Sequence, residues 1–140
     1  MTLTRHKDWR RRYEAAIDEI KARPFVWGEH DCGPSLAGRL VHAMTGVDLS
    51  AQYAGTYHDA LSAARLIREL GFETLGDLVA SMLPPIHPSQ AEIGDIAAIA
   101  MDGPIGHALG VVNGERIFVL TETGVGTVDL LDAAICFKVG

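Results

Sequence analysis

The sequence lacks the features that define several large classes of protein. Only two of its 140 residues are cysteines, so there is no disulfide framework, and nothing in the sequence supports a single bridge. No apolar run approaches the roughly 20 residues of a membrane-spanning helix. The N-terminal segment has no apolar stretch of the kind found in secretory signals, so we expect cytoplasmic synthesis without a signal peptide.

Positive charge is scarce as well. Lys and Arg number 12 against 18 Asp and Glu, which gives a net charge of −6. This balance disfavours nucleic-acid binding, which depends on neutralising phosphates. One basic cluster lies between Arg5 and Arg12, where Trp9, Tyr13 and Ile17 recur at helical spacing. We interpret the cluster as the solvated face of an amphipathic helix, with contact to an anionic polymer as the alternative.

The pattern of apolar residues predicts one α+β domain over residues 1–140, with an N-terminal helix in 1–23 and a core in 24–140. Helices come first and an antiparallel sheet follows. The expected helices span 5–22, with Thr4 as a candidate cap, 32–45, 57–70 and 74–83. After a break at Pro84, Pro85 and Pro88, the expected strands span 96–101, 107–112, 115–120, 126–130 and 134–139, with a hairpin turn at Asn113-Gly114.

Cys32 carries the most information about chemistry. Asp31 before it is a preferred N-cap residue, Pro34 suits a first helical turn, and Gly46 suits the end of a helix over 32–45. A thiol at a helix start is expected to have a lowered pKa, because the helix dipole and free N–H groups stabilise the thiolate. The alternative is an inert, buried cysteine. Cys136, inside an apolar segment, is expected to be such a buried residue.

A nucleophilic cysteine needs a base, and two histidines are candidates. His30 is two residues from Cys32, whereas His107 begins a predicted strand, which can present its ring rigidly against a helix start. A zinc site formed by His30, Asp31, Cys32 and His107 is a third possibility. It is disfavoured because three adjacent residues converge poorly on one ion and a second Cys-rich half is absent, so we expect no metal and no cofactor.

The residues from Phe25 to Cys32, Phe-Val-Trp-Gly-Glu-His-Asp-Cys, resemble the nucleophile motif of NlpC-type peptidoglycan peptidases. Gly94-Asp95-Ile96 and the run from Gly106 to Gly114 resemble the Gly-Asp strand and Gly-His hairpin of the same family. The resemblance covers about residues 24–140. It is closest to short versions associated with phage tails and phage-like gene transfer particles, so it implies a papain-like (NlpC-type) fold.

The resemblance also implies roles for individual residues. Cys32 corresponds to the nucleophile and His107 to the general base of a cysteine peptidase. Asp31 corresponds to an acid that caps and orients, Trp27 to an aromatic residue lining the cleft, and Asp95 to a structural acid. His30 is a supporting residue beside the cysteine. The third catalytic member would be Thr121 or Glu122, just beyond the hairpin.

Two functions follow from the resemblance. The first is hydrolysis of amide bonds in peptidoglycan stem peptides, with that peptide as substrate and phage tail or tail-tip proteins as partners. The second is an inactive NlpC-like subunit that serves as a structural or binding module of a phage tail or related particle. The second reading arises because an alternative alignment places Ala108 where the base belongs.

Overall fold

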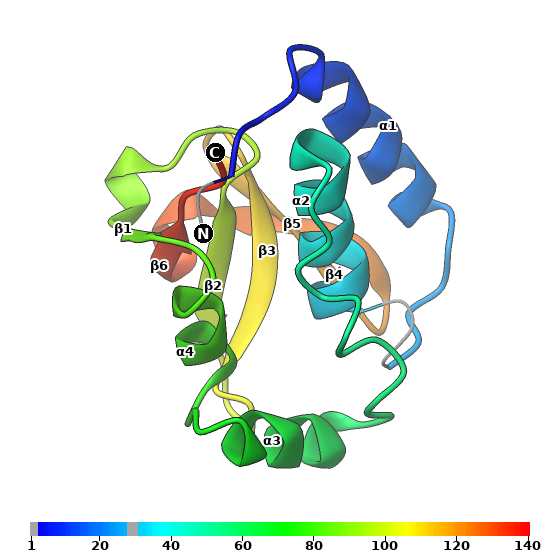
Figure 1. Ribbon diagram of the computed structural model, residues 1–140, viewed down its shortest axis with the longest axis vertical. Coiled ribbons are helices and arrows are strands. Elements are labelled where there is room, and N and C mark those ends of the chain that lie inside the picture. Colours follow the sequence, from blue (N-terminus) through cyan, green and yellow to red (C-terminus); the bar gives the residue numbers. More distant parts are fainter. Residues whose placement is uncertain (1–2, 28–30) are drawn as a thin grey trace.

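A six-stranded antiparallel sheet forms the centre of the structure, in the order β1–β6–β2–β3–β4–β5 (Figure 1). The structure is a computed structural model, and it describes residues 3–27 and 31–140. The strands are β1 (Pro85–Ile86), β2 (Ile96–Ala100), β3 (His107–Asn113), β4 (Arg116–Thr121), β5 (Gly124–Asp129) and β6 (Ala133–Phe137).

In the described part of the chain, four α-helices precede the main strands. They are α1 (Trp9–Lys21), α2 (Gly38–Thr45), α3 (Ala60–Glu69) and α4 (Leu75–Ala80). A π-helix, η1 (Cys32–Ala37), leads directly into α2, and two short 3-10 helices, η2 (Pro88–Gln90) and η3 (Leu130–Asp132), lie among the strands. Figure 1 shows α1 and α2 side by side along β3, with α3 and α4 grouped at the other end of the helical layer.

The predicted α+β order of helices and then an antiparallel sheet is confirmed, with ends that differ by a few residues. Asp31 is the N-cap of η1, and Gly46 ends α2 with a left-handed φ of 79°. The short strand β1 was not predicted, because its prolines suggested a break. It pairs at the sheet edge with β6, where Pro85 lies opposite Phe137.

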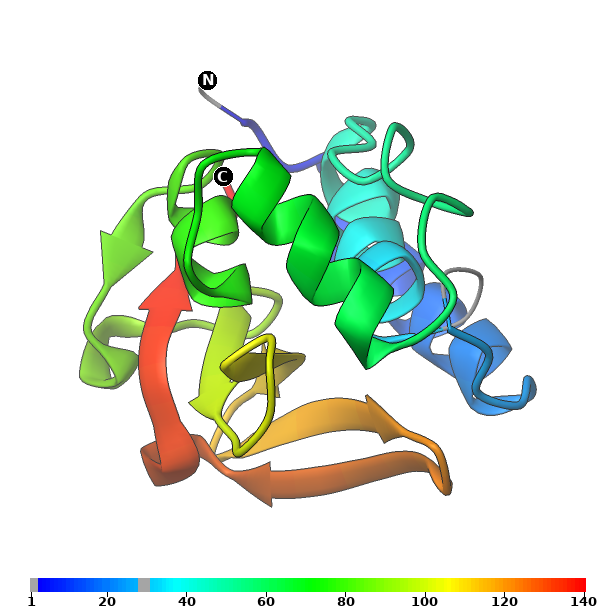
Figure 2. The same cartoon turned by 90° about the horizontal axis from the view of Figure 1, so that it is seen from below.

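The sheet buries both of its faces. On one face Ile96 of β2 and Leu109 and Val111 of β3 pack with the helices in the main core. On the other face Val112, Ile117 and Cys136 form a second core with residues from the ends of the sheet. Figure 2 shows that the β4–β5 hairpin is turned across the direction of β6. As predicted, Cys136 is fully buried, and both cysteines are free thiols.

A buried ion pair joins distant parts of the chain. The Arg5 guanidinium donates to Asp95 Oδ1 at 3.0 Å and to the Val139 carbonyl at 2.7 Å. Asp95 Oδ1 also accepts the Val139 N–H, and Oδ2 accepts the Glu92 N–H. This pair explains why α1 begins at Trp9 rather than at residue 5, and why Thr4 does not cap it. Arg5 is therefore no part of a solvated helix face.

The remaining basic residues of the cluster fit the prediction better. Arg10, Arg11 and Arg12 are exposed on α1, where Arg11 and Arg12 pair with Asp8 and Arg10 pairs with Glu14. Among residues 3–27 and 31–140, no helix is both long and apolar enough to cross a bilayer.

Replacing Asp95 tests the buried ion pair. Asp95→Asn leaves the Arg5 charge, whose side chain is 14% exposed, without its counter-ion, so the free energy of unfolding should fall by about 3–5 kcal/mol. The matched control is Asp129→Asn in the exposed Arg116–Asp129 pair, which should cost less than about 1 kcal/mol. Urea unfolding measures both, and equal losses would contradict a structural role specific to Asp95.

Candidate functional site

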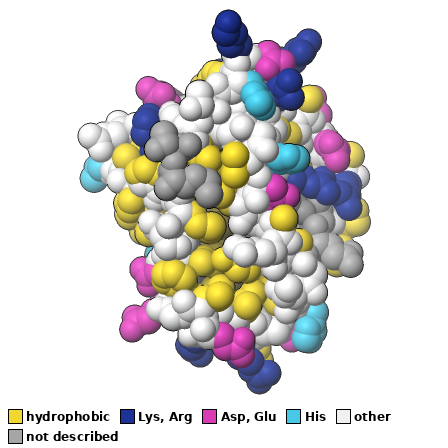
Figure 3. Space-filling model, in the orientation of Figure 1, with side chains coloured by type: hydrophobic (Ala, Val, Ile, Leu, Met, Phe, Trp, Pro, Cys, Tyr) yellow, Lys and Arg dark blue, Asp and Glu magenta, His cyan; other side chains and the backbone are white. Residues whose placement is uncertain are grey.

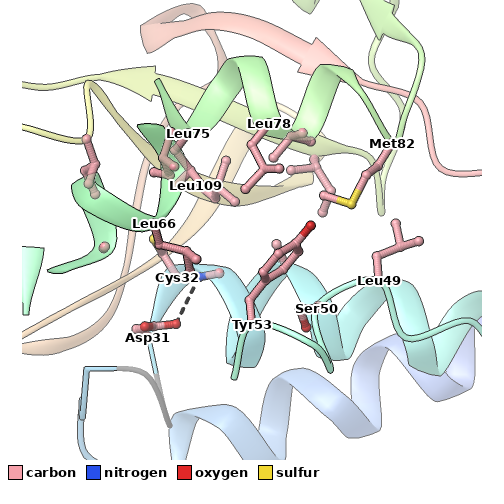
Figure 4. Close-up of a pocket in the computed structure, with 18 of the residues that line it drawn as sticks. Asp31, Cys32, Leu49, Ser50, Tyr53, Leu66, Leu75, Leu78, Met82 and Leu109 are labelled. Atoms are coloured by element: carbon pink, nitrogen blue, oxygen red, sulfur yellow. Dashed lines mark hydrogen bonds between the residues drawn. The ribbon is translucent and has the colours of Figure 1, made fainter. Parts of the chain in front are cut away.

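Cys32 lies where the helical layer meets the sheet. It is the first residue of η1, whose Leu36 N–H bonds to the Asp31 carbonyl five residues earlier, the wide spacing of a π-helix. The Asp31 side chain caps this turn by accepting the Gly33 N–H at 3.1 Å (Figure 4). The cap therefore uses one of the N–H groups that a helix start would otherwise offer to the sulfur.

A tyrosine for which the sequence predicted no role completes this arrangement. The Tyr57 hydroxyl donates to Asp31 Oδ2 at 2.5 Å, and Asp31 is almost fully buried. Burial raises the pKa of Tyr57 above its ordinary value, and the Asp31 carboxylate raises it further, so the hydroxyl keeps its proton and stays a donor. Tyr57 lies in the loop before α3, where no local pattern indicated a role.

A cavity of about 100 Å³ lies beside Cys32 and is lined by residues of η1, α2, the following loop, α3, α4 and the sheet. Figure 4 shows Cys32 on one wall facing Leu75 and Leu109, with Leu66 beside it and the Tyr53 ring between Cys32 and Leu49. The wall is almost entirely apolar. Figure 3 shows hydrophobic side chains gathered on this face of the molecule, between α2 and α4 and next to α3.

The expected lowering of the Cys32 pKa is wrong. Burial raises the pKa of the thiol to about 11, and the neighbouring Asp31 carboxylate contributes, against a smaller opposing effect of a backbone hydrogen bond from Leu109. The sequence showed a helix start but not the apolar wall around the sulfur. Removing water from the sulfur disfavours the thiolate more than the helix start favours it.

His107 begins β3 and is half-buried against α4. Its Nδ1 accepts the Gly76 N–H at 3.3 Å, so in the neutral ring the proton is assigned to Nε2. Alternate residues of a strand share a face, and Leu109 packs on the helical side. His107 is therefore directed to the same side of the sheet as Leu109, which lines the cavity together with Cys32. A side chain at position 76 would collide with the ring, so this contact requires glycine.

The two candidates for a third catalytic residue lie elsewhere. The β3–β4 ladder begins at the pair Asn113–Arg116 next to the turn and ends at the pair Gly110–Val119. Thr121 instead pairs with Gly124 of β5, and both Thr121 and Glu122 are exposed at that turn. The β3–β4 pairing thus places neither Thr121 nor Glu122 opposite His107.

The other predicted site residues are divided between two places. Trp27 lines the cavity and packs edge-on against Phe25, with ring centroids 5.2 Å apart. Asp95 holds Arg5 and Val139 and does not line the cavity. His30 lies outside the described residues. Within the part of the chain that is described, no group of three or more His, Cys, Asp or Glu side chains could hold a metal ion.

Comparison with known proteins gives one family. The profile of a family described as "Domain of unknown function (DUF6950)" matches residues 4–139, nearly the whole chain, so the chain belongs to this family. No curated protein matches the sequence.

The raised pKa of Cys32 predicts a specific pH dependence of alkylation. Below the pKa of about 11 the thiolate fraction grows about tenfold per pH unit, so iodoacetamide labelling of Cys32 should be slow at neutral pH and accelerate through the alkaline range. The measurement is mass-spectrometric labelling of Cys136→Ser protein, which retains Cys32. Cys32→Ser protein is the control, because Cys136 has a similar pKa but no exposed surface and should react more slowly. A labelling rate that levels off near neutral pH would contradict the raised pKa.

Proposed function

We propose that this member of the DUF6950 family is a papain-like, NlpC-type cysteine hydrolase that cleaves an amide bond in peptidoglycan stem peptides. Cys32 is the nucleophile and His107 the base. The observation that carries the proposal is that Cys32 and Leu109 line the same cavity, while His107, two residues before Leu109 on β3, lies on the same face of the strand. The motif resemblance from Phe25 to Cys32 and around Gly106-His107 supports the same pairing.

The proposed reaction requires the imidazole to take the thiol proton. His107 Nδ1 accepts the Gly76 N–H, and the thiol pKa is about 11. The ring therefore has to turn away from Gly76 and present an unprotonated nitrogen to the sulfur when substrate binds. Catalytic hydrogen bonds often form only in the complex with substrate. Backbone N–H groups near Cys32 would then stabilise the oxyanion.

A second function has its own support. The same two features, a thiol whose pKa is raised by burial and an imidazole nitrogen that accepts from Gly76, favour a catalytically inactive NlpC-like subunit that binds peptide in its cavity. Such a subunit would act as a structural or binding module of a phage tail or phage-like particle. Peptidoglycan is the shared ligand of both proposals, and only the first proposal predicts turnover.

Release of new amino groups from purified peptidoglycan distinguishes the two functions. A hydrolase should produce them, and Cys32→Ala or His107→Ala should each lower the rate by at least about 10⁴-fold, since nucleophile and base act as a unit. Cys136→Ala is the control, because that thiol lies in the other core and should be dispensable for activity.

Cosedimentation with peptidoglycan completes the comparison. Cys32→Ala protein should still sediment with the polymer if the cavity binds its peptides. Wild-type protein that sediments but releases no amino groups from several wall chemistries would establish the binding module instead. Wild-type protein that does neither would overturn both proposals.

A further inference from the structure

The cavity beside Cys32 has a composition that selects among acyl groups. We infer that it is the subsite for the acyl side of the substrate, and that it takes a short, uncharged, aliphatic group attached to the carbonyl that Cys32 attacks. The inference rests on the proposed function in one respect, which is that Cys32 is the nucleophile. It adds the chemical class of the group that lies next to the scissile bond.

The wall of the cavity explains why the group must be uncharged. Among the described residues that line it, none is Lys, Arg or His, so an anionic group would lose its water without gaining a counter-ion. Asp31 is the acidic residue of the wall, and its oxygens accept bonds from Gly33 and Tyr57. A cationic group would therefore have to compete with the Tyr57 hydroxyl for that carboxylate.

The size of the cavity suits a short group. At about 100 Å³ it is smaller than the roughly 150 Å³ apolar cavity that accommodates benzene in an engineered protein. A side chain or acyl chain of a few carbons fits this space. In Figure 4 the Tyr53 hydroxyl points across the cavity toward Leu78.

The covalent step places the acyl group at this wall. The Cys32 sulfur bonds to the carbonyl carbon, the C–N bond breaks, and the thiol proton passes through His107 to the departing amine. The acyl group is then a thioester on Cys32, with its aliphatic part against Leu109 and Leu75. Water attacks the thioester carbon, the C–S bond breaks, and the carboxylic acid leaves while the sulfur regains its proton.

Methionine methyl resonances test occupancy of the cavity without requiring any reaction. Met82 lines the cavity, whereas Met44 is buried in the main core and Met101 is exposed. In Cys32→Ala protein labelled at the methionine methyls, butyramide should shift the Met82 signal in a saturable way and leave those of Met44 and Met101 in place. Succinamate, an anion of similar length, should leave all of them unshifted. Equal shifts with both compounds, or no shift of Met82 with butyramide, would overturn the inference.

Acylation of Cys32 by p-nitrophenyl esters, followed by intact mass, tests the chain preference. Each added methylene from acetyl to butyryl should raise the rate about fourfold, and the succinyl ester should react at least about tenfold more slowly than the butyryl ester. Leu66→Lys, which places an ammonium group at the wall, should remove or reverse that discrimination. Leu61→Lys, on the same helix but exposed and outside the cavity, should leave it unchanged.

The outcomes separate this inference from the proposed function. Cys32 that is acylated equally by neutral and anionic esters, or an effect of Leu61→Lys equal to that of Leu66→Lys, would overturn the acyl-group preference and leave the nucleophile intact. Folded protein whose Cys32 is acylated by none of the esters, but whose Met82 signal responds selectively to butyramide, would instead remove the hydrolase and retain an aliphatic binding site.

Discussion

Burial of β3 on both faces is the constraint around which the rest of the structure is arranged. Leu109 and Val111 face the helices, and Val112 faces the second core. Gly110 lies between them, where a Cβ atom would sit 2.4 Å from an Ile117 methyl carbon, so the strand tolerates no side chain there. Because β3 cannot shift against either core without losing these contacts, it fixes where Cys32 and His107 stand relative to the sheet.

The sequence predicted the parts of the fold that depend on local patterns. Strands with alternating or continuous apolar residues, the Asp31 cap and the Gly46 stop were all recognisable without tertiary information. The start of α1 was not, because Arg5 leaves the helix to reach Asp95, 90 residues away. Strand β1 was missed for a similar reason, since pairing with β6 at a sheet edge overrides the proline signal.

The candidate site was predictable to a smaller degree. Cys32, Asp31 and Trp27 were selected from one segment, and all three line the same cavity. Tyr57 reaches that cavity from a loop whose local sequence carries no signal. The prediction of the thiol pKa failed for a physical reason. The helix start is encoded next to Cys32, whereas the apolar wall that removes water from the sulfur comes from α2, α3, α4 and the strands β2 and β3.

The clamp formed by Arg5, Asp95 and Val139 has a kinetic consequence. Its longest hydrogen-bonded connection, from Arg5 to the Val139 carbonyl, spans 134 positions, so the two ends of the chain have to meet before it is complete. Closing so large a loop is entropically costly, and contacts of this kind form late in folding. Interactions that are absent from the transition state act mainly on the unfolding rate. The clamp is thus expected to slow the opening of the native protein while leaving the speed of folding nearly unchanged.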